Sequence, residues 1–212
     1  SVSWHANTIG RILEACGAWQ SAVVFYQRFL DRRIGEAGEQ AWSVQLARLN
    51  YAALLVRLGR TGEAIPILRL ALSTLTRVLG PYDDTTLDTA YELALALGTV
   101  GETDEVKLLY PWLLRAAVSS PQPERDAKFA TGYANFLRGR EDVDCARPLA
   151  KDALQRLNAS SRPQSIETID ARYAAARLLC ELDPTDASLA VLRAAVDCLL
   201  DTLGPEHPYS LR

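Results

Sequence analysis

The feature that most constrains the fold of this 212-residue chain is an internal repeat of about 42 residues. Gly59 is followed by the apolar pair Ala71–Leu72, and a shift of 42 positions in either direction again finds a glycine and an apolar pair. The fourth copy is looser, because Gly139 matches Gly59 at a spacing of 80 and Ala153–Leu154 match at 82. Such periods are typical of solenoids, in which each copy packs only on its neighbours.

The links between copies repeat as well. Leu79–Asp84 matches Leu203–Pro208 at a spacing of 124, and Ala195–Val196 follows the same spacing within the last copy. We predict that the whole chain is one solenoid of five units, cut from a longer protein because it starts at Ser1 and contains no Met. The predicted units are residues 1–40, 41–83, 84–123, 124–163 and 164–206, with 208–212 beginning a sixth.

Each unit is predicted to be a pair of antiparallel helices. In residues 42–58 apolar side chains recur at spacings of three and four on more than one side, which predicts a helix covered by several neighbours. Residues 62–79 carry one apolar stripe, and Gly59 is the expected stop between the two helices. Because no stretch alternates with a period of two, we predict no strand.

Local signals predict how some of these helices begin. Pro66 and Pro148 hold equivalent places near helix starts, where the first amide groups have no partner within the helix. Thr85–Asp88 is predicted to form a capping box that opens the third unit.

These motifs resemble tetratricopeptide repeats (TPRs), specifically the longer repeats of kinesin light chains. The resemblance rests on Gly59, Glu63–Leu68 and Ala71–Leu72, and on the links that contain Leu79–Pro81 and Leu203–Pro208. It implies an all-α fold, a right-handed α-α superhelix in which the first helix of each pair lines a concave groove. It also implies that the groove binds another protein or a peptide.

Aligning the turn glycines places one residue of each first helix at the same groove position. The groove residues predicted from the resemblance are Asn7, Arg11, Leu49, Asn50, Arg57, Tyr91, Glu92, Phe129, Tyr133, Tyr173 and Arg177. The aromatic residues would suit apolar anchors of an extended or helical peptide, although packing between helices is the alternative for each of them. We predict no clamp for the carboxylate tail of a partner, because Glu92 would repel a carboxylate and no lysine accompanies Asn50.

Composition excludes several classes of partner. The net charge is −3 and no basic block stands out, which argues against nucleic-acid binding. Apolar runs are interrupted well before the roughly 18 residues of a membrane span, so we predict no membrane contact. The four scattered cysteines are predicted to be reduced thiols in a cytoplasmic protein, with a Cys180–Cys198 disulfide as the alternative.

No residue pattern predicts catalysis or a bound cofactor. The two histidines are His5 and His207, and neither accompanies a nucleophile in a predicted rigid element. No spacing suits zinc, calcium or a phosphate loop. We therefore predict a non-enzymatic interaction scaffold without cofactors or metals. The alternatives are a sensor arm of a nucleotide-driven STAND-type NTPase and self-association through the end repeats.

Overall fold

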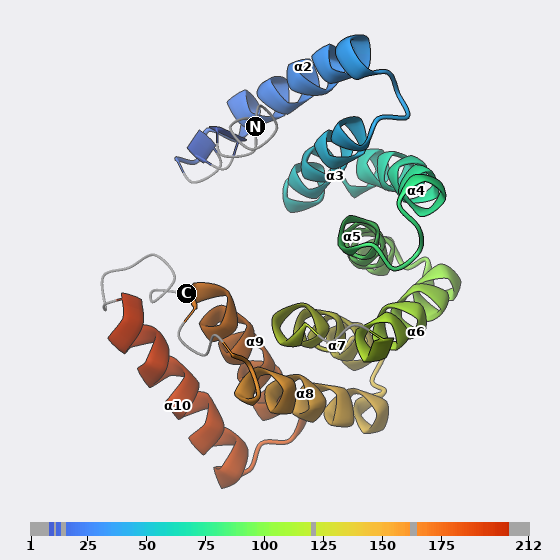
Figure 1. Cartoon of the computed structure of the whole chain (residues 1–212). Coiled ribbons are helices and arrows are strands. Elements are labelled where there is room, and N and C mark those ends of the chain that lie inside the picture. The colour runs from blue at the N-terminus through green and yellow to red at the C-terminus, as the bar shows by residue number, and fades with distance from the viewer. Residues whose placement is uncertain (1–8, 11, 14–15, 120–121, 162–164, 204–212) are drawn as a thin grey trace. The chain divides into compact units, whose positions relative to one another are not determined.

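The computed structural model describes residues 9–10, 12–13, 16–119, 122–161 and 165–203 (Figure 1). Within these ranges every regular element is a helix, and no strand is found. The helices are α2 (Trp19–Ala37), α3 (Trp42–Arg57), α4 (Thr61–Val78), α5 (Asp84–Val100), α6 (Thr103–Ser119), α7 (Pro123–Arg138), α8 (Val143–Asn158), α9 (Ile166–Leu182) and α10 (Asp186–Leu203). The all-α prediction is confirmed. No helix of the described ranges is long and apolar enough to cross a membrane.

The chain divides into two compact units, residues 1–109 and 110–212. In the first unit α2 packs on α3, α3 on α4 and α4 on α5, and α3 also contacts α5. Helix α3 is buried around most of its circumference, as its apolar pattern predicts, whereas α4 buries one stripe. The core of α4 is Ala64, Leu68, Ala71 and Leu75, all fully buried.

The second unit repeats this arrangement with α7, α8, α9 and α10. Each of these helices packs on the next, and α7 also contacts α9. The core between them is rich in alanine, which lets the helix backbones approach closely. Its fully buried alanines are Ala127, Ala130, Ala134, Ala146, Ala150, Ala153, Ala175 and Ala176.

Burial shows which positions of the second helices are equivalent. The alanine of the repeated apolar pair is buried in α4, α8 and α10, at Ala71, Ala153 and Ala195. Four residues later a leucine is buried in each helix, at 0%, 0% and 5% exposure for Leu75, Leu157 and Leu199 respectively. The spacings of 82 and 124 seen in the sequence therefore describe one packing surface that occurs three times.

The turn of the fourth pair differs from its prediction. Gly59 and Gly101 adopt left-handed backbone angles, with φ of 74° and 83°. Gly139 instead has φ of −63°, and the left-handed residue is Glu141, with φ of 63°. The match of Gly139 to Gly59 at a spacing of 80 was wrong for this role. The spacing is 82, the same as for Ala153–Leu154, because the left-handed turn residue lies two positions later.

Two predictions about helix starts were also wrong in detail. The N-cap of α5 is Asp83, whose carboxylate accepts hydrogen bonds from the amides of Thr85 and Thr86 at 2.9 and 3.4 Å, so no Thr85–Asp88 capping box forms. An ionised carboxylate satisfies these amides better than a threonine hydroxyl. Pro66 and Pro148 do hold equivalent places, but each lies five residues after its helix begins, where an amide would normally donate within the helix.

Candidate partner-binding surfaces

The first unit exposes one face of two neighbouring first helices. On α3 and α5, which contact each other, the half-buried and exposed positions follow helical spacing and occur 42 residues apart. Because the positions are equivalent, they lie on the same side of the helix pair. This face, the α3–α5 stripe, consists of Leu46, Asn50, Ala53 and Arg57 on α3, and Asp88, Glu92, Leu95 and Thr99 on α5. It is acidic on α5 and carries a cation at the end of α3.

The second unit exposes a corresponding face on α7 and α9, which also contact each other. The α7–α9 stripe consists of Lys128, Thr131, Asn135 and Arg138 on α7, and Asp170, Ala174, Arg177 and Glu181 on α9. Ion pairs cross it, because Arg138 lies 3.4 Å and Arg177 3.9 Å from the Glu181 carboxylate. These pairs are exposed to solvent and contribute little to stability, so they can rearrange when a ligand binds.

Several predicted groove residues lie within these stripes. Asn50 and Glu92 are half-buried in the α3–α5 stripe, Arg57 is exposed at the end of α3, and Arg177 is exposed on α9. Tyr173 is half-buried on α9, next to Ala174. Two further predicted residues, Asn7 and Arg11, lie outside the described residues.

Three predicted groove residues instead pack between helices. Leu49, Tyr91 and Phe129 are 8%, 7% and 0% exposed. Burial, and then the carboxylates of Glu92 and Asp88, raise the pKa of the Tyr91 phenol far above its ordinary value. For these residues the packing alternative holds, because they present almost no surface to a partner.

Tyr133 belongs to an aromatic cluster of the second unit. Its ring stacks on Tyr110 at 4.8 Å, and Phe136 lies 6.3 Å from both rings. The Arg140 guanidinium covers the outer side of this cluster, 4.9 Å from the Phe136 ring centre. At the spacing of 82, Tyr133 matches the buried Tyr51. The alignment on Gly139, at a spacing of 80, therefore assigned Tyr133 to the groove. The spacing of 82 shown by Ala153–Leu154 would instead have identified Lys128 and Asn135.

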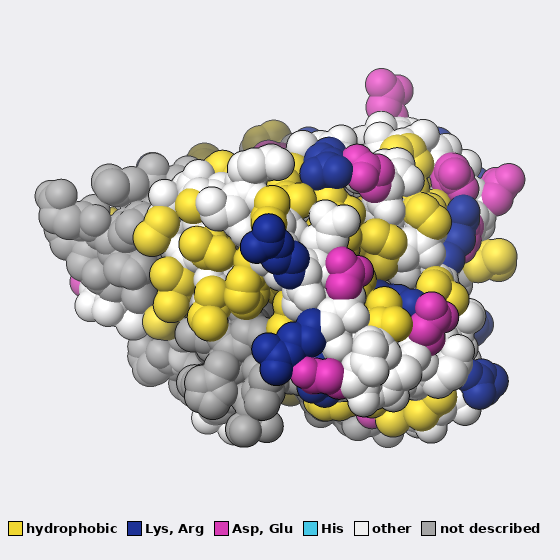
Figure 2. Space-filling view, turned by 90° about the horizontal axis from the view of Figure 1, so that it is seen from above, with side chains coloured by type: hydrophobic (Ala, Val, Ile, Leu, Met, Phe, Trp, Pro, Cys, Tyr) yellow, Lys and Arg dark blue, Asp and Glu magenta, His cyan; other side chains and the backbone are white. Residues whose placement is uncertain are grey.

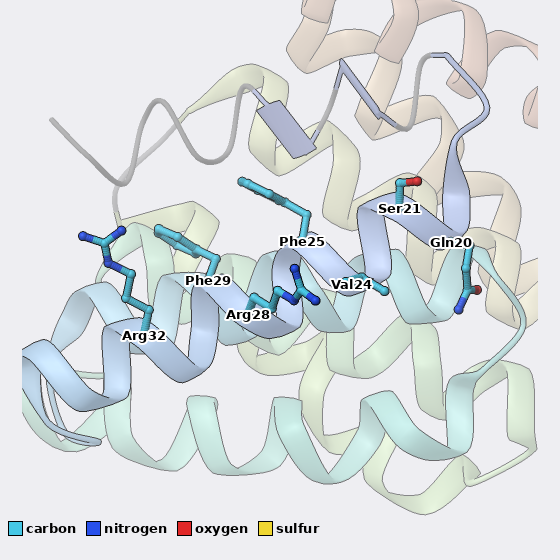
Figure 3. Close-up of a pocket in the computed structure, with 7 residues that line it drawn as sticks. All are labelled: Gln20, Ser21, Val24, Phe25, Arg28, Phe29 and Arg32. Atoms are coloured by element: carbon cyan, nitrogen blue, oxygen red, sulfur yellow. The ribbon is translucent and has the colours of Figure 1, made fainter.

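A separate hollow lies on α2. Its volume is about 540 Å³, and the described residues that line it are Gln20, Ser21, Val24, Phe25, Arg28, Phe29 and Arg32. Phe25, Phe29 and Arg32 project from the same side of the helix (Figure 3). The two phenyl rings are nearly parallel, with 6.3 Å between their centres. At the positions equivalent to Phe29 and Arg32, α4 has the buried small residues Ala71 and Thr74, so a motif search based on the repeat does not detect this hollow.

The surface around α2 combines apolar and cationic groups. Figure 2 looks onto the molecule from the side on which α2 lies in Figure 1, and hydrophobic side chains there adjoin arginine or lysine side chains. Arg28 is exposed, and Arg32 binds Glu36 at 2.6 Å. Such a surface suits an apolar ligand group that is flanked by a carboxylate.

The described residues contain no cluster of His, Cys, Asp and Glu that could hold a metal ion. All four cysteines are free thiols, so the alternative of a Cys180–Cys198 disulfide was wrong. A hydrogen bond to Asp142 and the negative charge of its carboxylate raise the pKa of the Cys145 thiol. This thiol is consequently a poor nucleophile at neutral pH.

Comparison with known proteins identifies the fold. No protein-family model and no curated protein matches the sequence. Among solved structures, the chain matches the TPR-like repeats of a protein described as a putative kinesin light chain from Podosopora anserina. The TM-score is 0.71 at 15% identity, covering 93% of this chain and 95% of the other. A variant of that protein matches with a TM-score of 0.73, again at 15% identity, covering 93% and 94% of the two chains.

A third structure, BtubC (BKLC) from P. vanneervenii, matches with a TM-score of 0.71 at 17% identity, over 91% of this chain and 76% of that one. These matches extend over most of the chain, in which helices adjacent in sequence pack on one another in series. The resemblance to the repeats of kinesin light chains is thereby confirmed at the level of fold. The chain has the all-α fold of a TPR-like repeat array.

Proposed function

We propose that this chain is a protein-interaction scaffold that binds a peptide segment of a partner on the exposed stripe formed by two adjacent first helices. The supporting observation is the α3–α5 stripe, where equivalent positions of two adjacent helices stay accessible while every other position within 44–55 and 86–97 is buried. A solenoid supplies such a surface without an enclosed pocket. Its ligand can therefore be an extended segment that contacts both repeats of a stripe.

The chemistry of the α3–α5 stripe favours a polar peptide with basic side chains. Asn50 and Glu92 are equivalent residues on neighbouring helices, so an amide and a carboxylate lie along the same side. The amide can bond a peptide backbone through both its donor and its acceptor, and the carboxylates of Asp88 and Glu92 favour lysine or arginine. This proposal replaces the predicted aromatic row, because Tyr91 and Phe129 are buried.

The proposed location is the cytoplasm, where four free thiols remain reduced. Binding by the stripes requires no catalytic residue, cofactor or metal. The buried core positions maintain the helix pairs, and the exposed positions alone determine what the array recognises.

The test is a selection of peptides from a random display library against the purified chain. A selected peptide is then titrated against Asn50→Ala/Glu92→Ala and against Leu70→Ser/Lys107→Ala, which changes exposed residues of the second helices α4 and α6. Loss of two hydrogen-bonding groups should weaken binding by about tenfold or more. The control should bind within about twofold of the parent chain, since it leaves the stripe intact. Unchanged binding by the stripe variant, with circular dichroism showing an intact fold, would refute the proposal.

A further inference from the structure

The α3–α5 stripe continues for one more turn, to the start of both helices. Trp42 lies four residues before Leu46, and Asp84 lies four residues before Asp88, so both belong to the helix face of the stripe. Both are exposed, and they are equivalent residues of two helices that contact each other. An indole and a carboxylate therefore occupy the same end of the stripe.

The equivalent end of the α7–α9 stripe is built differently. A shift of 82 places Glu124 at the start of α7 and Ile166 at the start of α9. The Glu124 carboxylate accepts hydrogen bonds from the hydroxyl groups of Ser160 at 2.5 Å and Thr168 at 3.0 Å. Ile166 is 50% exposed. The carboxylate at this end is therefore used within the fold, and an aliphatic side chain stands beside it.

Trp42 cannot form the contacts that Glu124 forms. Thr86 matches Thr168 at the spacing of 82 and is fully buried, and its hydroxyl finds no partner in the part of the chain that the structure describes. An indole has one N–H donor and no acceptor, so it cannot accept a hydrogen bond from this hydroxyl. Trp42 itself is 45% exposed. Nearly half of this residue is thus accessible to a ligand.

We propose that Trp42 and Asp84 anchor the ligand of the α3–α5 stripe by binding a lysine or arginine side chain of the peptide. This inference rests on the peptide binding proposed above, and it names the side chain that sets the position of the peptide along the stripe. A cation is attracted to the face of an indole, and the Asp84 carboxylate carries the opposite charge. Asp88 and Glu92, which follow Asp84 at intervals of one helical turn, extend the same preference along α5.

The anchor distinguishes the two stripes of the chain. The end of the α7–α9 stripe has no indole, and its carboxylate already has two hydroxyl donors from the fold. A basic side chain would have to displace those donors to bind there. A peptide with a basic anchor therefore binds the α3–α5 stripe in preference to the α7–α9 stripe.

The test is a double-mutant cycle between the full chain and a peptide selected from the display library. Each basic residue of the peptide is replaced by glutamine in turn, and every peptide is titrated against the parent chain, Trp42→Ala and Asp84→Asn. Trp42→Ala should weaken binding of the selected peptide by about tenfold, and Asp84→Asn by about threefold. One basic residue of the peptide should lose its contribution in Trp42→Ala, because its partner is already absent.

Two further variants show whether the aromatic ring is the group that matters. Trp42→Phe keeps a ring face and should recover most of the affinity that Trp42→Ala loses. Trp19→Ala is the matched control, because Trp19 is the first residue of α2, is 43% exposed and lies outside the stripe. It should bind the peptide as the parent chain does. Circular dichroism and urea midpoints of all variants verify that the fold is intact.

The outcomes separate the anchor from the stripe. Binding that is unchanged in Trp42→Ala but weaker in Asn50→Ala/Glu92→Ala would overturn the anchor and leave the stripe proposal in place. Binding that is unchanged in both variants would refute the stripe, and the anchor with it. Selected peptides without lysine or arginine, or basic residues that contribute equally with Trp or Ala at position 42, would also overturn the anchor.

Discussion

The second and fourth helix pairs, α3–α4 and α7–α8, bury the same columns of residues but differ in their turns and in their buried polar groups. Ala71 and Leu75 of one match Ala153 and Leu157 of the other in position and burial. The turn of one uses Gly59 in the left-handed region, and the turn of the other uses Glu141. The comparison shows that the packing columns define this repeat, while the turns are free to change in length and sequence.

Buried polar groups are the second difference. In the second pair, the side chains of Gln45 and Arg48 both donate to the backbone carbonyl of Glu39. Arg48 also donates to the side-chain oxygen of Gln45. The buried guanidinium and amide groups therefore find acceptors without a buried carboxylate. In the fourth pair, Asp126 is 1% exposed and bonds the Gln122 amide at 2.9 Å beside the buried Arg125. The fourth pair therefore depends on a buried carboxylate, and the second does not.

The largest expected effect tests the shared columns. Leu75→Ala and Leu157→Ala each remove a fully buried leucine at equivalent positions, and each should lower the free energy of unfolding by about 3 kcal/mol. Urea denaturation measures both. Leu108→Ala, at a position that is 73% exposed on α6, is the control and should cost less than about 0.5 kcal/mol. A large cost at one leucine only would break the equivalence.

The next effect tests the buried carboxylate. Asp126→Ala removes the acceptor of the Gln122 amide and the partner of a buried guanidinium, so it should cost about 3 kcal/mol. Gln45→Ala should cost less, about 1 to 2 kcal/mol, because Arg48 retains the Glu39 carbonyl. Urea denaturation of both variants measures which one loses more free energy of unfolding. Equal losses would show that the buried carboxylate has no special role.

The same residue predicts a dependence on pH. Burial is the main cause that raises the pKa of the Asp126 carboxyl, so the folded state binds its proton more tightly than the unfolded state. The stabilising contribution of the protonated Asp126 carboxyl is therefore full below its pKa in the unfolded chain. It is lost as the pH rises through its higher pKa in the folded chain. Relative to Asp126→Asn, the parent chain should gain stability when the pH is lowered from 7 towards 4. A difference that stays constant over this range would contradict the assignment.

The smallest effects test the turns. Gly59→Ala should cost about 1 kcal/mol because alanine is strained at a φ of 74°, and Glu141→Gly should gain a similar amount. Gly139→Ala is the matched control, since φ is −63° and a Cβ atom would meet only ordinary contacts at 3.5 and 3.6 Å. The midpoints of thermal and urea unfolding of the three variants measure these differences. If Gly139→Ala cost as much as Gly59→Ala, the spacing of 80 would be correct after all.

Most of the fold could be predicted from sequence because residues that are buried between helices recur at regular spacings. The pair Ala71–Leu72 and its copies identified the helix pairs, and the all-α fold followed from their periodicity. The turn of the fourth pair was misplaced because glycine is the usual left-handed residue, and Glu141 in that role gives no signal in a single sequence. The division into five units and the role as a sensor arm stay predictions.

The candidate site was harder to predict than the fold. Asn50, Glu92 and Arg177 lie at half-buried or exposed positions, and the spacings of 42 and 124 that placed them also match the buried columns. Their contact with a partner stays a prediction. Phe129 and Tyr133 were misplaced by the error of two residues, which turns the face of a helix by about 200° at roughly 100° per residue. The hollow on α2 was missed because large side chains there replace the small residues of the other repeats. A comparison of repeats identifies only the residues that recur.

The most direct test of the interaction surface is amide hydrogen exchange of the chain with and without a display-selected peptide. Bound peptide should slow exchange in the first helices α3 and α5, or in α7 and α9, along the stripes that contain Asn50, Glu92 and Arg177. The second helices α4 and α8 should change much less. Protection confined to α4 and α8, with none on the first helices, would contradict peptide binding by the stripes.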